Sequence, residues 1–162
     1  MLGVEFSSQA VQAFFDENKL NPQHQNHEKF ECWVENGINI LCGDFFDMEK
    51  NQLSNVSAVY DRASLVALSP AIRKKYVHHL LSILPPATQI LLITFDYPQH
   101  EMTGPPFAVS PGEVVACFHQ YAQVRLLAQF DMLEQNPSFQ ERGLSQIQES
   151  IFLLTTGHFY KR

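Results

Sequence analysis

The stretch VSAVYDRASLVALSP, residues 56–70, decides the fold class of this chain. Its apolar beginning, residues 56–60, predicts a buried strand. A helix is expected from Ser69, because serine caps helix N-termini and a proline, which suits the first turn, follows it. The strand ends in Asp61 and Arg62, and ligands of open α/β sheets bind beyond the carboxyl ends of strands. This charged pair is therefore either a strand-end salt bridge or part of a ligand site.

The same alternation extends outward in both directions. Strands are expected at residues 1–5, 29–35, 38–42, 56–60, 89–95, 123–130 and 150–156. Helices are expected to begin near Ser7, Ser69 and Ser110. The pattern predicts a doubly wound α/β sheet with an antiparallel edge, formed by the last two strands, in one domain over residues 1–162. Polar segments, including residues 21–28, are interpreted as loops.

Composition excludes several classes of function. With 162 residues, 45% hydrophobic and 17% charged, the chain is globular. A net charge of -6 makes it a poor nucleic-acid binder. Its one basic cluster, Arg73 to Lys75, is interpreted as a solvated helix face. No apolar run approaches the ~20 residues of a membrane span. The three cysteines fit no disulfide framework, so we expect a reduced, cytoplasmic protein.

No metal site is expected. His24 and His27 have a ligand-like spacing, but no further ligands accompany them, which favours a solvated loop. His78 and His79 are adjacent on a helix and cannot both face one metal.

Two further strand ends carry carboxylates. Glu5 ends the first strand and could bind ribose hydroxyls, or could simply interact favourably with a helix start. Asp44 ends the strand before GDFF and could accept from an adenine amine, with Phe45 covering the ring. An ordinary strand-to-loop turn is the alternative for Asp44 and Phe45.

A stiff loop follows the strand at residues 89–95. It contains Gly104, Pro105, Pro106 and Phe107, and the prolines restrict its backbone. Phe107 could form the wall of a pocket for a planar substrate, and a rigid turn around a buried ring is the alternative.

Taken together, GVEFS, GDFF, VYDRASLVALSPAIRKKYVHHL, GPPF and NPSFQERGL resemble the bacterial thiopurine S-methyltransferases, in order from residue 1 to the C-terminus. The resemblance implies a Rossmann-like class I methyltransferase that uses S-adenosylmethionine and releases S-adenosylhomocysteine. It implies methyl transfer to the sulfur of a small aromatic or heterocyclic thiol, with no nucleic-acid or membrane partner.

The resemblance also implies roles for individual residues. Glu5 would hold the cofactor ribose, and Asp44 with Phe45 would border the adenine. Arg62 would lie between cofactor and substrate, with Asp61 as its structural partner. Arg142 would approach the substrate from the late loop, so Arg62 and Arg142 are the candidate catalytic residues. The loop from Gly104 through Pro105 and Pro106 to Phe107 would shape the substrate pocket.

Family members would have a first strand and a glycine loop ahead of GVEFS. Without them, the strands around residues 1–5 and 56–60 would each lose a neighbour and expose backbone groups. We therefore expect weak or absent cofactor binding by residues 1–162. Family members are expected to be monomers, and open strand edges would permit self-association of this chain. Two alternatives stay open: a non-catalytic interaction module, and methyl transfer to selenium, tellurium or a halide.

Overall fold

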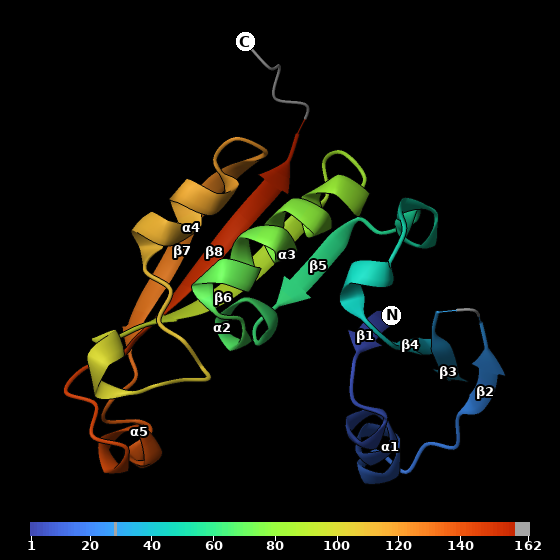
Figure 1. Ribbon diagram of the computed structural model, residues 1–162, viewed down its shortest axis with the longest axis horizontal. Coiled ribbons are helices and arrows are strands. Elements are labelled where there is room, and N and C mark those ends of the chain that lie inside the picture. The colour runs from blue at the N-terminus through green and yellow to red at the C-terminus, as the bar shows by residue number, and fades with distance from the viewer. Residues whose placement is uncertain (28, 158–162) are drawn as a thin grey trace. The chain divides into compact units, whose positions relative to one another are not determined.

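The computed structural model describes residues 1–27 and 29–157. Contacts divide the chain into two compact units, residues 1–49 and residues 50–162. Strands and helices alternate along the chain (Figure 1), which confirms the predicted α/β, Rossmann-like class. One domain over residues 1–162 stays a prediction. No helix within the described residues is long and apolar enough to cross a membrane.

The first unit is built on a four-stranded sheet. Its elements are β1 (Leu2–Glu5), α1 (Ser8–Glu17), β2 (Gln23–Asn26), β3 (Glu31–Glu35), β4 (Ile38–Cys42) and the 3-10 turn η1 (Phe45–Asp47). The strand order is β1-β4-β3-β2, with β1 parallel to β4 and the other pairs antiparallel. The predicted hairpin turn is confirmed, since Asn36 and Gly37 both have positive φ, 49° and 77°.

Helix α1 packs on this sheet through a small aromatic core. Val11 and Phe15 on α1 contact Trp33 and Ile40 on the strands, and the rings of Phe15 and Trp33 stack at 5.8 Å between centroids. Ser7 caps α1, as its spacing predicts, by accepting from the Ala10 amide at 3.2 Å.

The interpretation of residues 21–28 as a loop was wrong for part of the segment. Gln23–Asn26 forms β2, whose four side chains are all exposed. This edge strand is held by backbone pairing with β3 and therefore shows no apolar alternation in its sequence.

The second unit carries the other sheet. Its elements are η2 (Lys50–Leu53), β5 (Ala58–Asp61), α2 (Ser64–Ala67), α3 (Pro70–Ile83), β6 (Gln89–Asp96), η3 (Gln99–Glu101), α4 (Pro111–Phe118), β7 (Ala122–Asp131), α5 (Pro137–Glu141) and β8 (Gln148–Thr156). The order is β5-β6-β8-β7, with β5 parallel to β6 and the others antiparallel. The antiparallel edge formed by the last two strands is confirmed.

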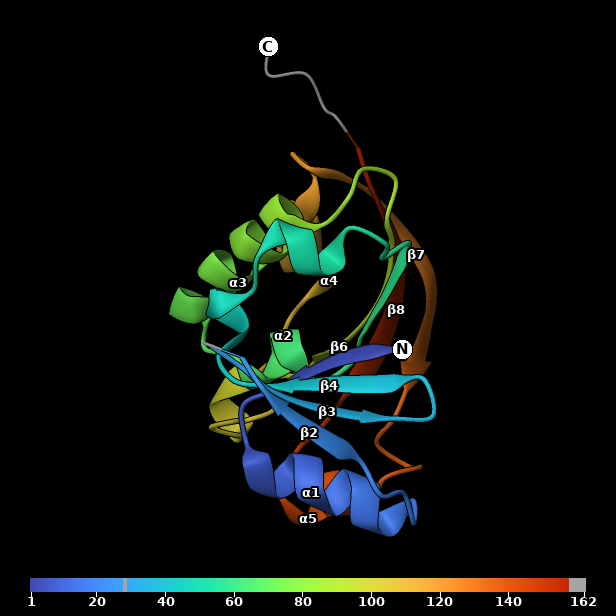
Figure 2. The ribbon, with the colours of Figure 1, turned by 90° about the vertical axis from the view of Figure 1, so that its right-hand side faces the viewer.

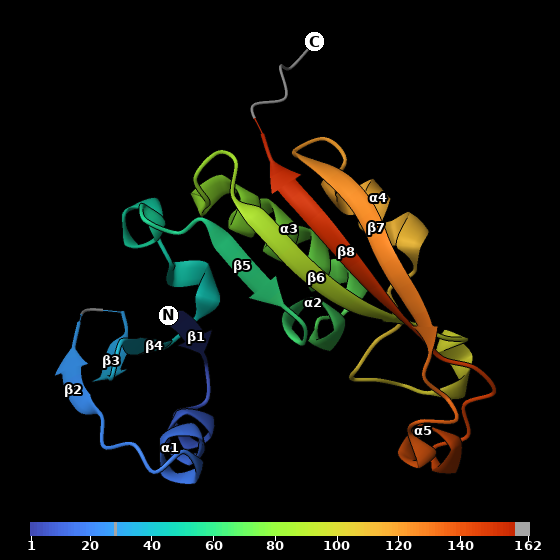
Figure 3. The same cartoon turned by 180° about the vertical axis from the view of Figure 1, so that it is seen from behind.

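Helices α3 and α4 lie on one face of this sheet, as the edge-on view in Figure 2 and the view from behind in Figure 3 show. The expectation that residues 56–60 form a buried strand was wrong for much of β5, where Tyr60 is 62% exposed. Within the described residues, β1 and β5 each pair on one side only.

The interpretation of the basic cluster, Arg73 to Lys75, as a solvated helix face was wrong for Arg73. Arg73 on α3 is 1% exposed, and its guanidinium pairs with Glu113 on α4 and donates to the Leu68 carbonyl at 3.1 Å. A helix periodicity that places Tyr76 and Val77 in the core also turns Arg73 inward. The ion pair therefore joins α3 to α4.

Candidate functional site

Asp61 and Arg62, adjacent at the end of β5, have different environments. Asp61 is 2% exposed and accepts from the Tyr76 hydroxyl at 2.7 Å and from the Ser64 amide at 3.2 Å. Burial raises the pKa of the Asp61 carboxyl, and these hydrogen bonds oppose the rise. Asp61 therefore anchors α2 and α3 to the strand end.

Arg62 does not pair with Asp61, so the salt-bridge alternative and the implied partnership were both wrong. Its guanidinium Nη2 lies 3.8 Å from Oε2 of Glu149 on β8, and the Arg62 side chain is 59% exposed. Successive strand residues face opposite sides of a sheet, which separates two adjacent charges.

Arg62 lines a cleft of about 400 Å³ at the carboxyl end of β5 and β6. The remaining walls are mostly apolar and come from α2, β6 and the proline loop: Ala63, Val66, Ala67, Phe95, Pro105 and Pro106. The structure therefore brings Arg62, Pro105 and Pro106 together at one concave surface, as a substrate pocket requires.

The proline loop is fixed by contacts from two sides. The Phe107 amide donates to the Val66 carbonyl at 2.6 Å, and the Tyr97 hydroxyl donates to the Pro106 carbonyl at 2.6 Å. Gly104 has φ +78°, and a Cβ there would lie 2.7 Å from the Phe107 ring. Gly104 and Phe107 thus support the loop, while the two prolines line the cleft.

Arg142 reaches the same loop from the end of α5. Its guanidinium Nη2 lies 3.5 Å from the Pro105 carbonyl oxygen. The surrounding segment is anchored by Leu144 and Ile147 in an apolar cluster with Tyr97, and by Ser145, which donates twice to the Glu101 carboxylate. Residues far apart in sequence therefore meet at the proline loop.

The candidate cofactor residues Glu5 and Asp44 belong to the first unit. In the parallel pairing of β1 with β4, Glu5 lies beside Cys42, and the Gly43 amide donates to the Glu5 carbonyl at 2.9 Å. Asp44 follows directly and accepts from the Phe46 amide at 2.9 Å. Two exposed carboxylates thus end neighbouring parallel strands.

These two hydrogen-bond acceptors suit the adenosine part of S-adenosylmethionine. A carboxylate such as Glu5 can accept from two vicinal hydroxyls, and Asp44 can accept from an exocyclic amine. Phe45 is an aromatic ring next to Asp44, with its centroid 6.0 Å from that of Phe46. Cys42, the partner of Glu5 in this strand pairing, has a thiol pKa above its ordinary value. Burial is the main cause of the raised pKa, and the charges of Glu31 and Glu5 add to it, so the thiol stays protonated.

Sequence reasoning missed Glu149. The last strand was expected from residue 150, which left this glutamate in a polar loop, but β8 begins at Gln148. Glu149 is 9% exposed. The signal that could have found it is a single charge at the start of an apolar strand, opposite Phe95.

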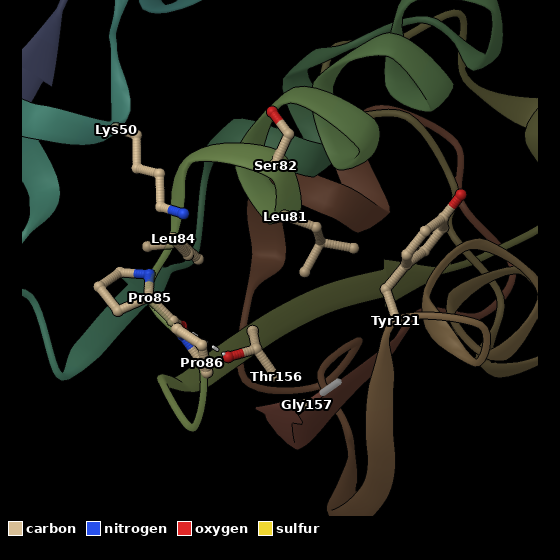
Figure 4. Close-up of a pocket in the computed structure, with 9 residues that line it drawn as sticks. All are labelled: Lys50, Leu81, Ser82, Leu84, Pro85, Pro86, Tyr121, Thr156 and Gly157. Atoms are coloured by element: carbon tan, nitrogen blue, oxygen red, sulfur yellow. Dashed lines mark hydrogen bonds between the residues drawn. The ribbon is translucent and has the colours of Figure 1, made fainter. Parts of the chain in front are cut away.

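A second hollow, of about 210 Å³, lies where α3 ends and β8 finishes (Figure 4). Lys50, Tyr121 and Thr156 are among its lining residues. The Thr156 hydroxyl donates to the Pro85 carbonyl at 2.9 Å and accepts from the Thr88 amide at 2.9 Å. Its hydroxyl is thus used within the fold, and no candidate residue from the sequence lies there.

Comparison of the sequence with known proteins gives a consistent result. A family model described as thiopurine S-methyltransferase matches residues 1–157. The chain is 62% identical to a thiopurine S-methyltransferase of Nitrosospira multiformis over 156 residues, which cover 96% of this chain and 71% of that protein. It is 43% identical to the corresponding protein of Pseudomonas paraeruginosa over 157 residues, covering 97% and 72%.

Solved structures share the fold at low identity. The N-methyltransferase NodS of Bradyrhizobium japonicum, in complex with S-adenosylhomocysteine, matches with a TM-score of 0.58 and 8% identity, over 94% of this chain and 65% of that chain. An arsenic(III) S-adenosylmethionine methyltransferase of Chlamydomonas reinhardtii gives a TM-score of 0.64 and 11% identity, over 99% and 56%. The fold is that of class I methyltransferases, and the chain belongs to the thiopurine S-methyltransferase family.

Proposed function

We propose that this protein transfers a methyl group from S-adenosylmethionine to the sulfur of a small aromatic or heterocyclic thiol. The observation that carries the proposal is the cleft in which Arg62 and the Pro105-Pro106 wall meet, with Arg142 in contact with the Pro105 carbonyl. A guanidinium beside an apolar, ring-sized hollow suits a planar substrate whose sulfur carries negative charge.

The residues of the chain would position the acceptor. Bound S-adenosylmethionine supplies an electrophilic methyl group, and Glu5, Asp44 and Phe45 would hold its adenosine. Arg62 would donate to the acceptor sulfur and favour its thiolate, since a nearby cation stabilises an anion. Arg142, which contacts the Pro105 carbonyl, would approach the substrate from the segment that follows α5. An acidic aromatic thiol needs little further acid or base catalysis, so orientation and exclusion of water would account for most of the rate.

The test is methyl transfer to an aryl thiol, measured with the intact protein and with Arg62→Ala and Arg142→Ala. Each replacement should lower kcat/KM by about tenfold or more, the loss expected when one charged contact to the reacting group is removed. Arg125→Ala is the matched control, because Arg125 is an exposed arginine on β7 and lines neither hollow. Full activity of both variants would reject the assignment.

The alternative of a non-catalytic interaction module rests on the unpaired edges of β1 and β5. Titration of residues 1–162 with S-adenosylhomocysteine by calorimetry distinguishes a methyltransferase from a non-catalytic interaction module. An obligate dimer that binds no cofactor would favour the module, and micromolar affinity would contradict the expectation of weak binding by these residues.

A further inference from the structure

Glu149 lies next to the cleft. In the antiparallel pairing of β6 with β8, Glu149 is the direct partner of Phe95, so their side chains share one face of the sheet. Phe95 lines the cleft, and Arg62, which also lines it, has its guanidinium 3.8 Å from Glu149 Oε2. The Glu149 carboxylate on β8 therefore lies beside Phe95 and Arg62, two of the residues that line the cleft.

This carboxylate has an unused hydrogen-bonding position. Within residues 1–27 and 29–157, the buried Oε2 atom has no hydrogen-bond partner. The Arg62 guanidinium balances its charge but is too far away to donate. By contrast, the buried Asp61 receives hydrogen bonds from both Tyr76 and Ser64. Buried acceptors are almost always satisfied, so an unsatisfied one at a cleft points to a donor that arrives with a ligand.

We propose that Glu149 accepts a hydrogen bond from a ring N–H of the substrate, next to the sulfur that Arg62 contacts. This inference rests on the proposed function and adds to it a residue that selects the substrate. Arg62 is a donor and Glu149 Oε2 is an acceptor, side by side. A heteroaromatic thione, which is the conjugate acid of the thiolate, presents the complementary pair, a sulfur acceptor beside an N–H donor.

Of the two charged partners, Arg62 is the one with room to move away from Oε2. The Arg62 side chain is 59% exposed and makes no other ion pair among the described residues, whereas the Glu149 side chain is 12% exposed. Rotation of the long arginine side chain toward the substrate sulfur would open the acceptor. Phe95, Pro105 and Pro106 then offer flat apolar walls to the ring.

The experiment compares 2-thiopyridone, which has an N–H beside its sulfur, with N-methyl-2-thiopyridone, which does not. Binding to the intact protein is measured by calorimetry, with and without S-adenosylhomocysteine. The N–H compound should bind about tenfold more tightly, the effect expected for one hydrogen bond to a charged group. Glu149→Leu should abolish this preference, and Glu149→Gln, which keeps an acceptor oxygen, should retain part of it.

Glu134→Leu on the exposed segment after β7 is the control and should leave the preference intact. Circular dichroism checks that each variant is folded. A folded Glu149→Leu protein that still prefers the N–H compound would overturn the inference, as would a wild-type protein that binds both compounds equally. Failure of both compounds to bind, together with the absence of methyl transfer to aryl thiols, would overturn the proposed function and this inference with it.

Discussion

The hydroxyl of Tyr76, in the middle of α3, donates to the carboxylate of Asp61 at 2.7 Å, and both residues are buried. Burial and the neighbouring Asp61 charge raise the pKa of the Tyr76 hydroxyl well above its usual value, so it remains a donor. A helix is thereby attached to the strand end from which Arg62 enters the cleft.

Loss of this hydrogen bond should destabilise the protein. Tyr76→Phe leaves one Asp61 oxygen without its hydroxyl donor and should lower the free energy of unfolding by about 1.5–3 kcal/mol. Urea denaturation followed by circular dichroism measures the change. Tyr121→Phe, at a residue that is 43% exposed, should cost much less. Equal effects of the two substitutions would contradict this account of Tyr76.

Asp61 should also give the stability a characteristic pH dependence. Its pKa is raised above the ordinary 3.8 by burial, so the folded protein holds a proton that the unfolded chain releases. The resulting stabilisation is present below the unfolded pKa and is lost as pH rises through the folded pKa. The difference in unfolding free energy between wild type and Asp61→Asn should therefore fall with rising pH above 3.8. Urea titrations across this range measure it, and a difference that rises with pH would refute the assignment.

Gly104 should be less replaceable than Gly143. Both have positive φ, +78° and +89°, so alanine strains the backbone at either position. Only at Gly104 would the new Cβ meet a ring, that of Phe107 at 2.7 Å, whereas nothing lies within 4 Å of a Cβ at Gly143. Gly104→Ala should destabilise the protein by about 1–3 kcal/mol more than Gly143→Ala, the usual cost of overpacking. Thermal unfolding of the two variants compares them, and equal losses would show that the ring moves aside freely.

The ion pair between α3 and α4 should be sensitive to the removal of one partner. Glu113→Gln leaves the Arg73 charge buried without its counter-ion and should cost about 3 kcal/mol. Lys74→Gln, at the next residue on the exposed side of α3, should change the free energy of unfolding by less than about 0.5 kcal/mol. Chemical denaturation distinguishes the two, and a neutral Glu113→Gln would show that Arg73 finds another acceptor.

Periodicity and caps in the sequence were sufficient to predict most strands and the longer helices, because apolar repeats and serine caps act locally. They were insufficient for β2, an edge strand whose four residues are all polar and exposed, and for α5, a short helix in a polar segment. The inward orientation of Arg73 depends on Glu113, a residue of another helix, and no local pattern records that contact.

The candidate site shows the same limit. Strand ends and the proline loop could be read from the sequence, and the structure brings Arg62, Pro105 and Pro106 to one cleft. The partner of Arg62 could not be read, since Glu149 lies 87 residues further along the chain by its number and reaches the arginine through the pairing of β6 with β8. Adjacent charges suggested Asp61 instead, although the pleat of a strand separates neighbours.

The anchored proline loop has a consequence for the thermodynamics of binding. Val66, Tyr97 and Arg142 hold its carbonyl and amide groups from three different segments of the chain. The loop thus loses its conformational entropy when the chain folds. Binding of a rigid ring therefore orders little more of the protein. Affinity at such a preorganised surface is governed by shape, so an added substituent that collides with Pro105 or Pro106 should be rejected sharply instead of being accommodated.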